Sequence, residues 1–245
     1  MMRIAGVGIL LASLFLAAGC GKSSSFDKRK ERAVEEFRAG RFAEAAETLD
    51  SLARTDSRDF DVRYYLARSL EESGRFAEAL EEWNAVLILR PQLVEAHYRR
   101  GICLITLERI DDAIAAWSRA AEMDPTYHRA YYNLGRAYEQ KEDWDNAVRF
   151  YLKAIEADST FTAAYINLGF LLQRADQLES ALDLFDSAIR LDPDFQPPYM
   201  NRIQILLALG REEEAAESIR GFLSTHTPEP ALTDSLHMLL EAIER

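Results

Sequence analysis

The sequence repeats with a fixed period of 34 residues from Phe26 onward, and this period constrains the fold more than any other feature. Successive windows begin at positions 26, 60, 94, 128, 162 and 196, with no insertion between them. The twentieth position of every window is alanine: Ala45, Ala79, Ala113, Ala147, Ala181 and Ala215. A period of this length predicts a repeat protein in which each unit packs mainly against its neighbours.

Each window carries the pattern of two helices joined by a tight turn. Proline stands near the end of three windows, at Pro91, Pro125 and Pro193, where its fixed φ and missing N–H stop a helix. A break also divides every window near its middle. Three breaks are Gly-Arg pairs beginning at Gly40, Gly74 and Gly210, and three are polar pairs beginning at Glu108, Glu142 and Asp176. We therefore predict antiparallel helices over roughly positions 1–14 and 18–31 of each window.

Two further columns indicate how the helices of a window pack. The eighth position is small in five windows: Ala33, Ala67, Gly101, Gly135 and Gly169. The twenty-fourth is large and aromatic in four: Trp83, Trp117, Tyr151 and Phe185. A small side chain lets two helices approach closely, and a large one fills the remaining space.

These columns resemble the tetratricopeptide repeat. The family pattern is matched most fully in the fourth window, by Tyr131, Leu134, Gly135, Tyr138, Ala147, Tyr151 and Ala154. The resemblance implies an all-α fold, an α-solenoid forming a right-handed superhelix of six helix-turn-helix units. The units would be residues 26–59, 60–93, 94–127, 128–161, 162–195 and 196–229, followed by a C-terminal capping helix over 230–245. The sixth window departs from the pattern, with Ile203 in the small position and Phe222 at position 27.

The N-terminus differs in kind from the repeats. A short basic start precedes an uncharged, mostly apolar run from Ile4 to Ala18, and small residues lead to Cys20. This run is short for a membrane span, which needs about 20 residues, so it favours a signal peptide over residues 1–19. The stretch LAAGC resembles the lipobox of bacterial lipoproteins, although Ala17 stands where leucine is more usual.

That resemblance implies lipid on Cys20 and a protein anchored to a bacterial membrane without spanning it. The stretch GKSSS that follows is typical of a flexible linker, so residues 20–25 are predicted to be the lipidated cysteine and a tether. Gly21 after the cysteine resembles the pattern of lipoproteins that are sorted to the outer membrane. We therefore expect the protein to face the periplasm from the outer membrane, in preference to the inner membrane. An ordinary secretory signal with a chance cysteine, or an uncleaved anchor, stays open at this point.

Composition and motifs exclude several classes of function. The net charge of −12 argues against nucleic acid as the main partner, because that binding depends on clustered Lys and Arg. The four histidines show no metal-ligand spacing, no nucleophile motif is present, and Cys103 is expected to be a core thiol. We therefore expect no enzyme, no metal and no cofactor.

The resemblance places five positions of each first helix, 2, 5, 9, 12 and 13, on a concave groove. Together with the sixth position, they give the predicted peptide-binding residues: Tyr64, Arg68, Tyr98, Ile102, Tyr132, Asn133, Arg136, Ile166, Asn167, Phe170, Met200, Asn201 and Gln204. Aromatic and aliphatic side chains interspersed with arginine suit an extended peptide or a helix. The alternative is that the tyrosines at position five only pack against the neighbouring unit.

The sixth position is asparagine in three successive windows, at Asn133, Asn167 and Asn201. An asparagine side chain has a donor and an acceptor, so it can pair with a peptide backbone. The column is similar to the asparagine ladder that grips extended peptides in the superhelix of O-GlcNAc transferase. The alternative is that these asparagines only join adjacent helices.

The sequence therefore predicts a membrane-anchored scaffold that binds other proteins in the groove. Two uses compete, a pilotin-like assembly factor for an envelope machine and an adaptor for cell-wall enzymes. A third hypothesis is a self-associating structural protein, a homo-oligomer whose groove is filled by another copy or by its own tail.

Overall fold

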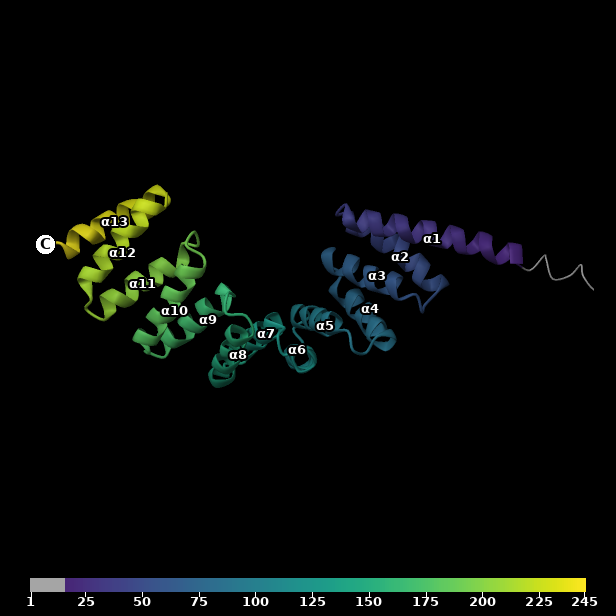
Figure 1. The fold of residues 1–245 in the computed structure, drawn as a ribbon, viewed down its shortest axis with the longest axis horizontal. Coiled ribbons are helices and arrows are strands. Elements are labelled where there is room, and N and C mark those ends of the chain that lie inside the picture. The colour runs from purple at the N-terminus through teal and green to yellow at the C-terminus, as the bar shows by residue number, and fades with distance from the viewer. Residues whose placement is uncertain (1–15) are drawn as a thin grey trace, which may run out of the picture. The chain divides into compact units, whose positions relative to one another are not determined.

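The computed structural model describes residues 16–245, and the side chains from Ser25 onward. In this part of the chain thirteen helices and no strands are present (Figure 1). The first helices of the repeats are α1 (Leu16–Arg38), α3 (Phe60–Glu72), α5 (Val94–Thr106), α7 (His128–Gln140), α9 (Thr162–Arg174) and α11 (Pro197–Ala208). The second helices are α2 (Phe42–Thr55), α4 (Phe76–Leu89), α6 (Ile110–Met123), α8 (Trp144–Ala157), α10 (Leu178–Leu191) and α12 (Glu212–Thr225), and α13 (Pro230–Ile243) closes the chain.

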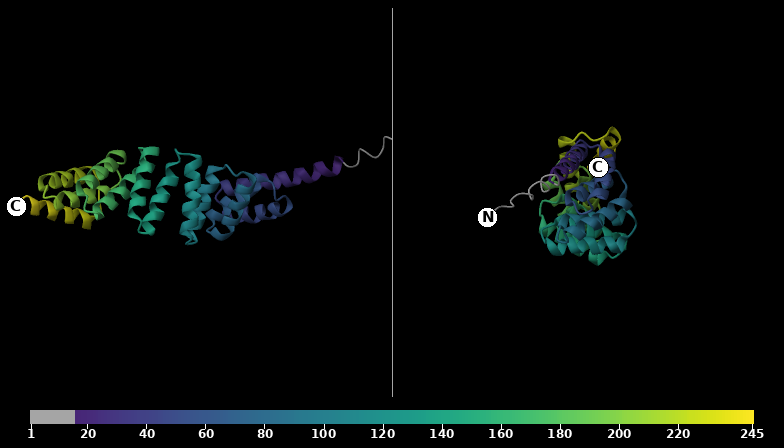
Figure 2. Two further views of the ribbon diagram at one scale, coloured as in Figure 1. Left: turned by 90° about the horizontal axis from the view of Figure 1, so that it is seen from below. Right: turned by 90° about the vertical axis from the view of Figure 1, so that its right-hand side faces the viewer.

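The helices confirm the predicted all-α fold of helical pairs. Helices α3, α5, α7 and α9 begin at the first residue of the windows that start at 60, 94, 128 and 162. The described residues form two compact units, one that ends at Ala116 (unit 1) and one over Trp117–Arg245 (unit 2), and their boundary falls within α6. Within unit 2 the helices from α7 to α13 follow one another in chain order (Figures 1 and 2).

The turn between the helices of each repeat has one geometry in all six repeats. Position 15 has a positive φ every time, at 76° for Gly40 and Gly74 and at 58° for Glu142. The N–H of the next residue donates to the carbonyl five residues earlier, as from Arg75 to Leu70 at 2.8 Å and from Asp143 to Tyr138 at 2.9 Å. This Schellman geometry satisfies carbonyls that the helix end would leave unpaired. The polar pairs of the sequence therefore make the same turn as the Gly-Arg pairs.

The small and aromatic columns meet inside the fourth and fifth repeats. Tyr151 and Phe185 are fully buried. A Cβ added at Gly135 would lie 2.6 Å from the Tyr151 ring, and one added at Gly169 would lie 3.0 Å from the Phe185 ring. Glycine is required at Gly135 because the aromatic ring occupies the space of a side chain.

The sixth repeat shows how the departures from the pattern are accommodated. Ile203 and Phe222 are buried with Ile219 in one cluster, which Leu236 of α13 completes. Exposed polar residues such as Asp234, His237 and Glu241 occur on the same helix. Helix α13 thus buries its apolar side on the last repeat and leaves polar groups in water, as a terminal unit of a repeat stack requires.

The N-terminal predictions lie mostly outside the described residues. Residues 1–15, and the side chain of the predicted lipid site Cys20, are not described. Helix α1 begins at Leu16, so residues 20–25 are helical where the sequence predicts a flexible tether. No proline interrupts the chain between Leu16 and Arg38, so the helix can continue through these residues. Within residues 16–245, no helix is both long and apolar enough to cross a bilayer.

Candidate functional site

The candidate site is the first-helix face of unit 2, formed by positions five and nine of α7, α9 and α11. The three helices are joined by side-chain contacts. The Asn167 amide on α9 donates to the hydroxyl of Tyr132 on α7 at 3.3 Å. Ile166 of α9 packs on the cluster that contains Ile205 and Leu206 of α11. The first-helix face is therefore one continuous surface of three repeats.

Position five of each helix forms the floor of this face. Tyr132, Ile166 and Met200 are half-buried. The Tyr132 ring lies edge-on to Phe161, with centroids 5.1 Å apart, and 5.8 Å from the Tyr151 ring. These two rings belong to the same repeat as Tyr132, and Tyr132 also packs on the cluster that contains Leu168 and Leu171 of α9. Position five therefore contributes to packing within and between repeats, while still reaching the surface.

Position nine forms an exposed row above that floor. Arg136, Phe170 and Gln204 are all exposed. Phe170 keeps 39% of its surface in water, although one edge rests on Phe185 with centroids 5.5 Å apart. An exposed phenylalanine between an arginine and a glutamine offers apolar area, charge and amide groups to a second molecule.

The three asparagines of position six lie in three different environments. Asn133 is only 8% exposed. Asn167 donates both to Tyr132 and, at 3.2 Å, to the Tyr151 hydroxyl. Asn201 donates to the carbonyl of Pro197 in its own helix at 2.9 Å. The contacts of Asn167 favour the joining of helices over a peptide-binding ladder, whereas the contact of Asn201 stays within its own helix.

Asn167 belongs to a polar network between the fourth and fifth repeats. The buried Tyr151 hydroxyl accepts from Asn167 and donates to the carboxylate of Glu139 at position 12 of α7. Burial, and then the hydrogen bond to Glu139, raise the pKa of Tyr151 well above its ordinary value. The phenol therefore stays protonated and serves as a fixed donor.

Unit 1 carries the same network two windows earlier. Glu71 accepts from the indole N–H of Trp83 at 3.1 Å and from the guanidinium of Arg99 at 3.0 Å. Burial raises the pKa of Glu71, and the charge of Arg99 opposes that rise. Positions 6, 12 and 24 are thus a polar connection between successive repeats, whether position 6 is arginine or asparagine. Sequence analysis missed this connection, which columns 6, 12 and 24 indicate only when they are compared together.

None of the predicted groove residues of unit 1 is exposed, and Tyr64 and Arg68 have partners within the chain. Tyr64 donates to Glu95 at 2.9 Å. The Arg68 guanidinium lies 5.2 Å from the Phe37 ring centroid and 3.7 Å from the Glu95 carboxylate. Tyr98 and Ile102 are half-buried. The open part of the predicted site is therefore the face in unit 2.

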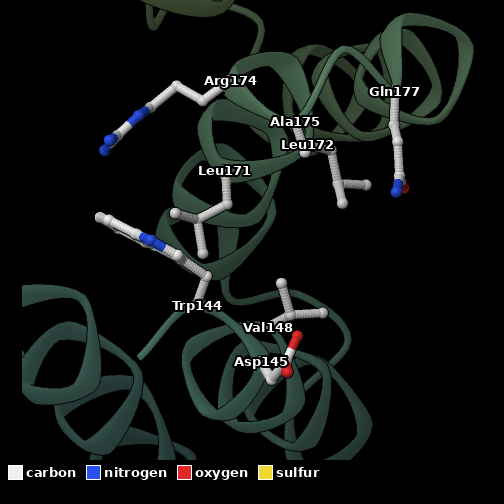
Figure 3. Close-up of a pocket in the computed structure, with 8 residues that line it drawn as sticks. All are labelled: Trp144, Asp145, Val148, Leu171, Leu172, Arg174, Ala175 and Gln177. Carbon is white, nitrogen blue, oxygen red and sulfur yellow. The ribbon is translucent and has the colours of Figure 1, made fainter. Parts of the chain in front are cut away.

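A surface pocket of unit 2 was not predicted from sequence. It has a volume of about 410 Å³ and is walled by Trp144 and Val148 of α8 and by Leu171 and Leu172 of α9 (Figure 3). The guanidinium carbon of Arg174 lies 4.4 Å from the Trp144 ring centroid. Position 17 holds phenylalanine, isoleucine or leucine in four other windows. The tryptophan at this position in the fourth window was the sequence feature that could have indicated the pocket.

The described residues carry no arrangement typical of catalysis. Burial raises the pKa of the Cys103 thiol to about 12, so it stays protonated at neutral pH and is a poor nucleophile. Within residues 16–245 no group of three His, Cys, Asp or Glu side chains is placed to hold a metal ion. The exposed first-helix face is suited to recognition by contact.

Comparison with known proteins agrees with this geometry. Models of the tetratricopeptide repeat match residues 30–94, 66–117 and 98–160, and a second model of the same repeat matches 150–183. The first set alone spans more than half of the 245 residues, so the chain belongs to the tetratricopeptide repeat family. No curated protein matches the sequence.

Several solved structures share the fold. The chain is similar to MamA 41-end from Desulfovibrio magneticus RS-1, with 26% identity and a TM-score of 0.64 over 70% of this chain and 97% of that one. It is also similar to PilW, described as a widely conserved type IV pilus biogenesis factor, with 20% identity, a TM-score of 0.65, and 86% and 98% covered. PilF of Pseudomonas aeruginosa gives 16% identity and a TM-score of 0.66, with 82% and 92% covered.

Proposed function

We propose that this protein is a scaffold that binds an extended peptide or a helix of another protein on the first-helix face of unit 2. The observation that carries the proposal is the exposed row of Arg136, Phe170 and Gln204 above a half-buried floor. The polar groups beneath this row, at Tyr151 and Asn167, are hydrogen-bonded within the chain. A partner would therefore gain contacts at position nine without leaving those buried groups unpaired.

The scaffold would act at a bacterial cell envelope, held by lipid on Cys20, and the outer membrane is favoured. The support is the apolar N-terminal run that ends in LAAGC. Two or three acyl chains hold a protein stably at a membrane, since each buried CH₂ contributes about 0.8 kcal/mol. A pilus biogenesis factor occurs among proteins of the same fold, but its 20% identity is evidence of fold and does not choose between assembly factor and cell-wall adaptor.

Photo-crosslinking tests the binding face. A benzoylphenylalanine placed at Phe170 or at Gln204 in the native cell should give discrete protein adducts. The matched control is Leu152, an apolar residue with 52% of its surface exposed on the second helix α8. Adducts from Leu152 alone, or from no site, would contradict the proposal. Adducts that contain only a second copy of the chain, together with a dimer in light scattering, would favour the self-associating alternative.

Metabolic labelling with an alkyne-bearing palmitate tests the anchor. The wild-type protein should be labelled and fractionate with membranes, while Cys20→Ser should lose both properties. Label retained by Cys20→Ser would contradict lipidation at this residue. Cys103→Ser is the matched control, because Cys103 is buried and should carry no lipid.

A further inference from the structure

We propose that the segment bound on the first-helix face of unit 2 is acidic, an inference that rests on the proposed binding function. In unit 2 the first helices of the repeats together carry a positive charge, and the second helices together carry a negative charge. Helices α7, α9 and α11 carry four arginines and one glutamate, a net charge of +3. Helices α8, α10 and α12 carry nine acidic and four basic residues, a net charge of −5. Without Arg202, which pairs with Asp186, the first helices still carry three arginines against one glutamate, so a protein of net charge −12 concentrates positive charge on them.

Arg129 and Arg136 of α7 are exposed and available to a partner, whereas the Arg174 guanidinium rests on the Trp144 ring. No ion pair among the described residues involves Arg129, Arg136 or Arg174. The single acid, Glu139, already accepts a hydrogen bond from Tyr151. By contrast, Arg202 on α11 is paired with Asp186 of α10 at 2.6 Å, and we assign it no role in binding.

The spacing of the exposed side chains matches an extended chain. Arg129 and Arg136 are seven residues apart on α7, so they lie on one side of that helix. Arg136 and Phe170 occupy the same position on adjacent first helices. Packed helix axes lie about 8–10 Å apart, which equals about three residues of extended chain. The best ligand therefore carries a carboxylate and, about three residues away, a large apolar side chain.

The acidic segment is favoured over other occupants by charge complementarity. Arginine forms two-pronged hydrogen bonds with carboxylates, which adds geometry to the attraction. A nucleic acid would also be anionic, but its many phosphates would be repelled by the acidic second helices of the same unit. The glutamates of α12 in a second copy of the chain could also bind the arginines, and the test below detects such self-association.

Fluorescence polarisation with the full chain in detergent tests the inference. The probe is a fluorescein-labelled peptide of twelve residues. Every third residue is glutamate or leucine, in alternation, and all other residues are serine. Two matched peptides replace every glutamate with glutamine or with lysine. We expect the glutamate peptide to bind at least about tenfold more tightly than the glutamine peptide, and the difference to shrink as salt rises from about 50 to 300 mM.

Two variants locate the effect. Arg136→Gln should weaken the glutamate peptide by about threefold to tenfold. Arg190→Gln makes the same charge change at an exposed arginine of the second helix α10 and should leave affinity unchanged. Equal losses in both variants would overturn the inference, because they would show a response to net charge alone.

The other outcomes separate the inference from the proposed function. If the glutamine peptide binds as tightly as the glutamate peptide and Phe170→Ser weakens both, the face binds peptides but the acidic class is wrong. If no peptide binds and Phe170 gives no crosslink, the proposed function fails as well. A dimer that Arg136→Gln dissociates, or a single-stranded DNA oligonucleotide that competes for the same site, would also overturn the inference.

Discussion

Gly135→Ala is expected to destabilise the protein even though alanine is the better helix former. The added Cβ would lie 2.6 Å from Cε1 and 2.7 Å from Cδ1 of Tyr151. Tyr151 is fully buried, and its hydroxyl bonds both Glu139 and Asn167. The ring therefore cannot move aside without straining these two bonds.

The expected magnitude follows from three contributions. Overpacking a core costs about 1–3 kcal/mol, and weakening a hydrogen bond of Tyr151 adds about 1 kcal/mol. Replacing glycine by alanine inside a helix returns about 1 kcal/mol. The free energy of unfolding should therefore fall by about 1–3 kcal/mol.

Two other glycines provide matched controls. At Gly169 the added Cβ would lie 3.0 Å from Phe185, which has no hydroxyl to hold it, so the net change should be near zero. At Gly221, inside α12, no atom lies within 4 Å of the added Cβ, so alanine should stabilise by about 0.5–1 kcal/mol. Urea unfolding gives the order, and hydrogen exchange of the α7 and α8 amides shows whether the loss is local.

A Gly135→Ala protein as stable as Gly221→Ala would refute the steric reasoning. The role of the hydroxyl is tested separately in a Tyr151→Phe background. Without the hydroxyl the ring is free to shift, so the cost of Gly135→Ala should be smaller there than in the wild type. An unchanged cost would show that the hydrogen bonds do not hold the ring in place.

Three further predictions concern the network, the turn and the response to acid. Asn167→Ala removes a donor to two tyrosine hydroxyls and should lower the free energy of unfolding by about 1–2 kcal/mol, while Asn201→Ala, whose amide bonds only its own helix, should cost less than about 0.5 kcal/mol in the same urea titration. Glu142→Gly should stabilise by about 0.5–1 kcal/mol because φ is 58° there, and Gly74→Ala, at a φ of 76°, should destabilise by about 1–2 kcal/mol; equal effects would contradict the turn geometry. Burial would raise the pKa of Asp59, but hydrogen bonds from Lys30 and the Val62 N–H lower it on balance, so this stabilisation is present above the ordinary pKa of aspartate and is lost as pH falls through the lowered value. Asp59→Asn should therefore flatten the decline of stability below about pH 4, and an unchanged acid limb would contradict the assignment.

The helices and their ends could be predicted because the repeat supplies six versions of one pattern. The turn illustrates this, since Gly40 and Gly74 indicate a left-handed residue at position 15 and Glu142 adopts the same φ without glycine. Packing of the whole repeat thus overrides the local preference of glutamate at that position.

The partners of polar side chains could not be predicted in the same way. Asn167 bonds Tyr132 and Tyr151, which come from a first and a second helix of the preceding repeat. Which groups meet between two repeats depends on positions 6, 12 and 24 together. In unit 1 the contact is made by Arg99 at position 6 and Glu71 at position 12. The column of asparagines at position 6 therefore suggested a ligand site in the sequence, and the contacts of these side chains in the structure support such a site less.

The repeat also separates residues that build the fold from residues that can confer specificity. Position 20 is alanine in all six windows, and those alanines are fully buried. Position nine reads Val34, Arg68, Ile102, Arg136, Phe170 and Gln204. Its last three members are exposed on one face, and of these only Phe170 also contacts the buried core, through Phe185. Partner choice should therefore depend on position nine. Exchanging Arg136 and Phe170 should alter which peptide binds, and loss of the Phe170–Phe185 contact should lower the free energy of unfolding by about 0.5–1.5 kcal/mol.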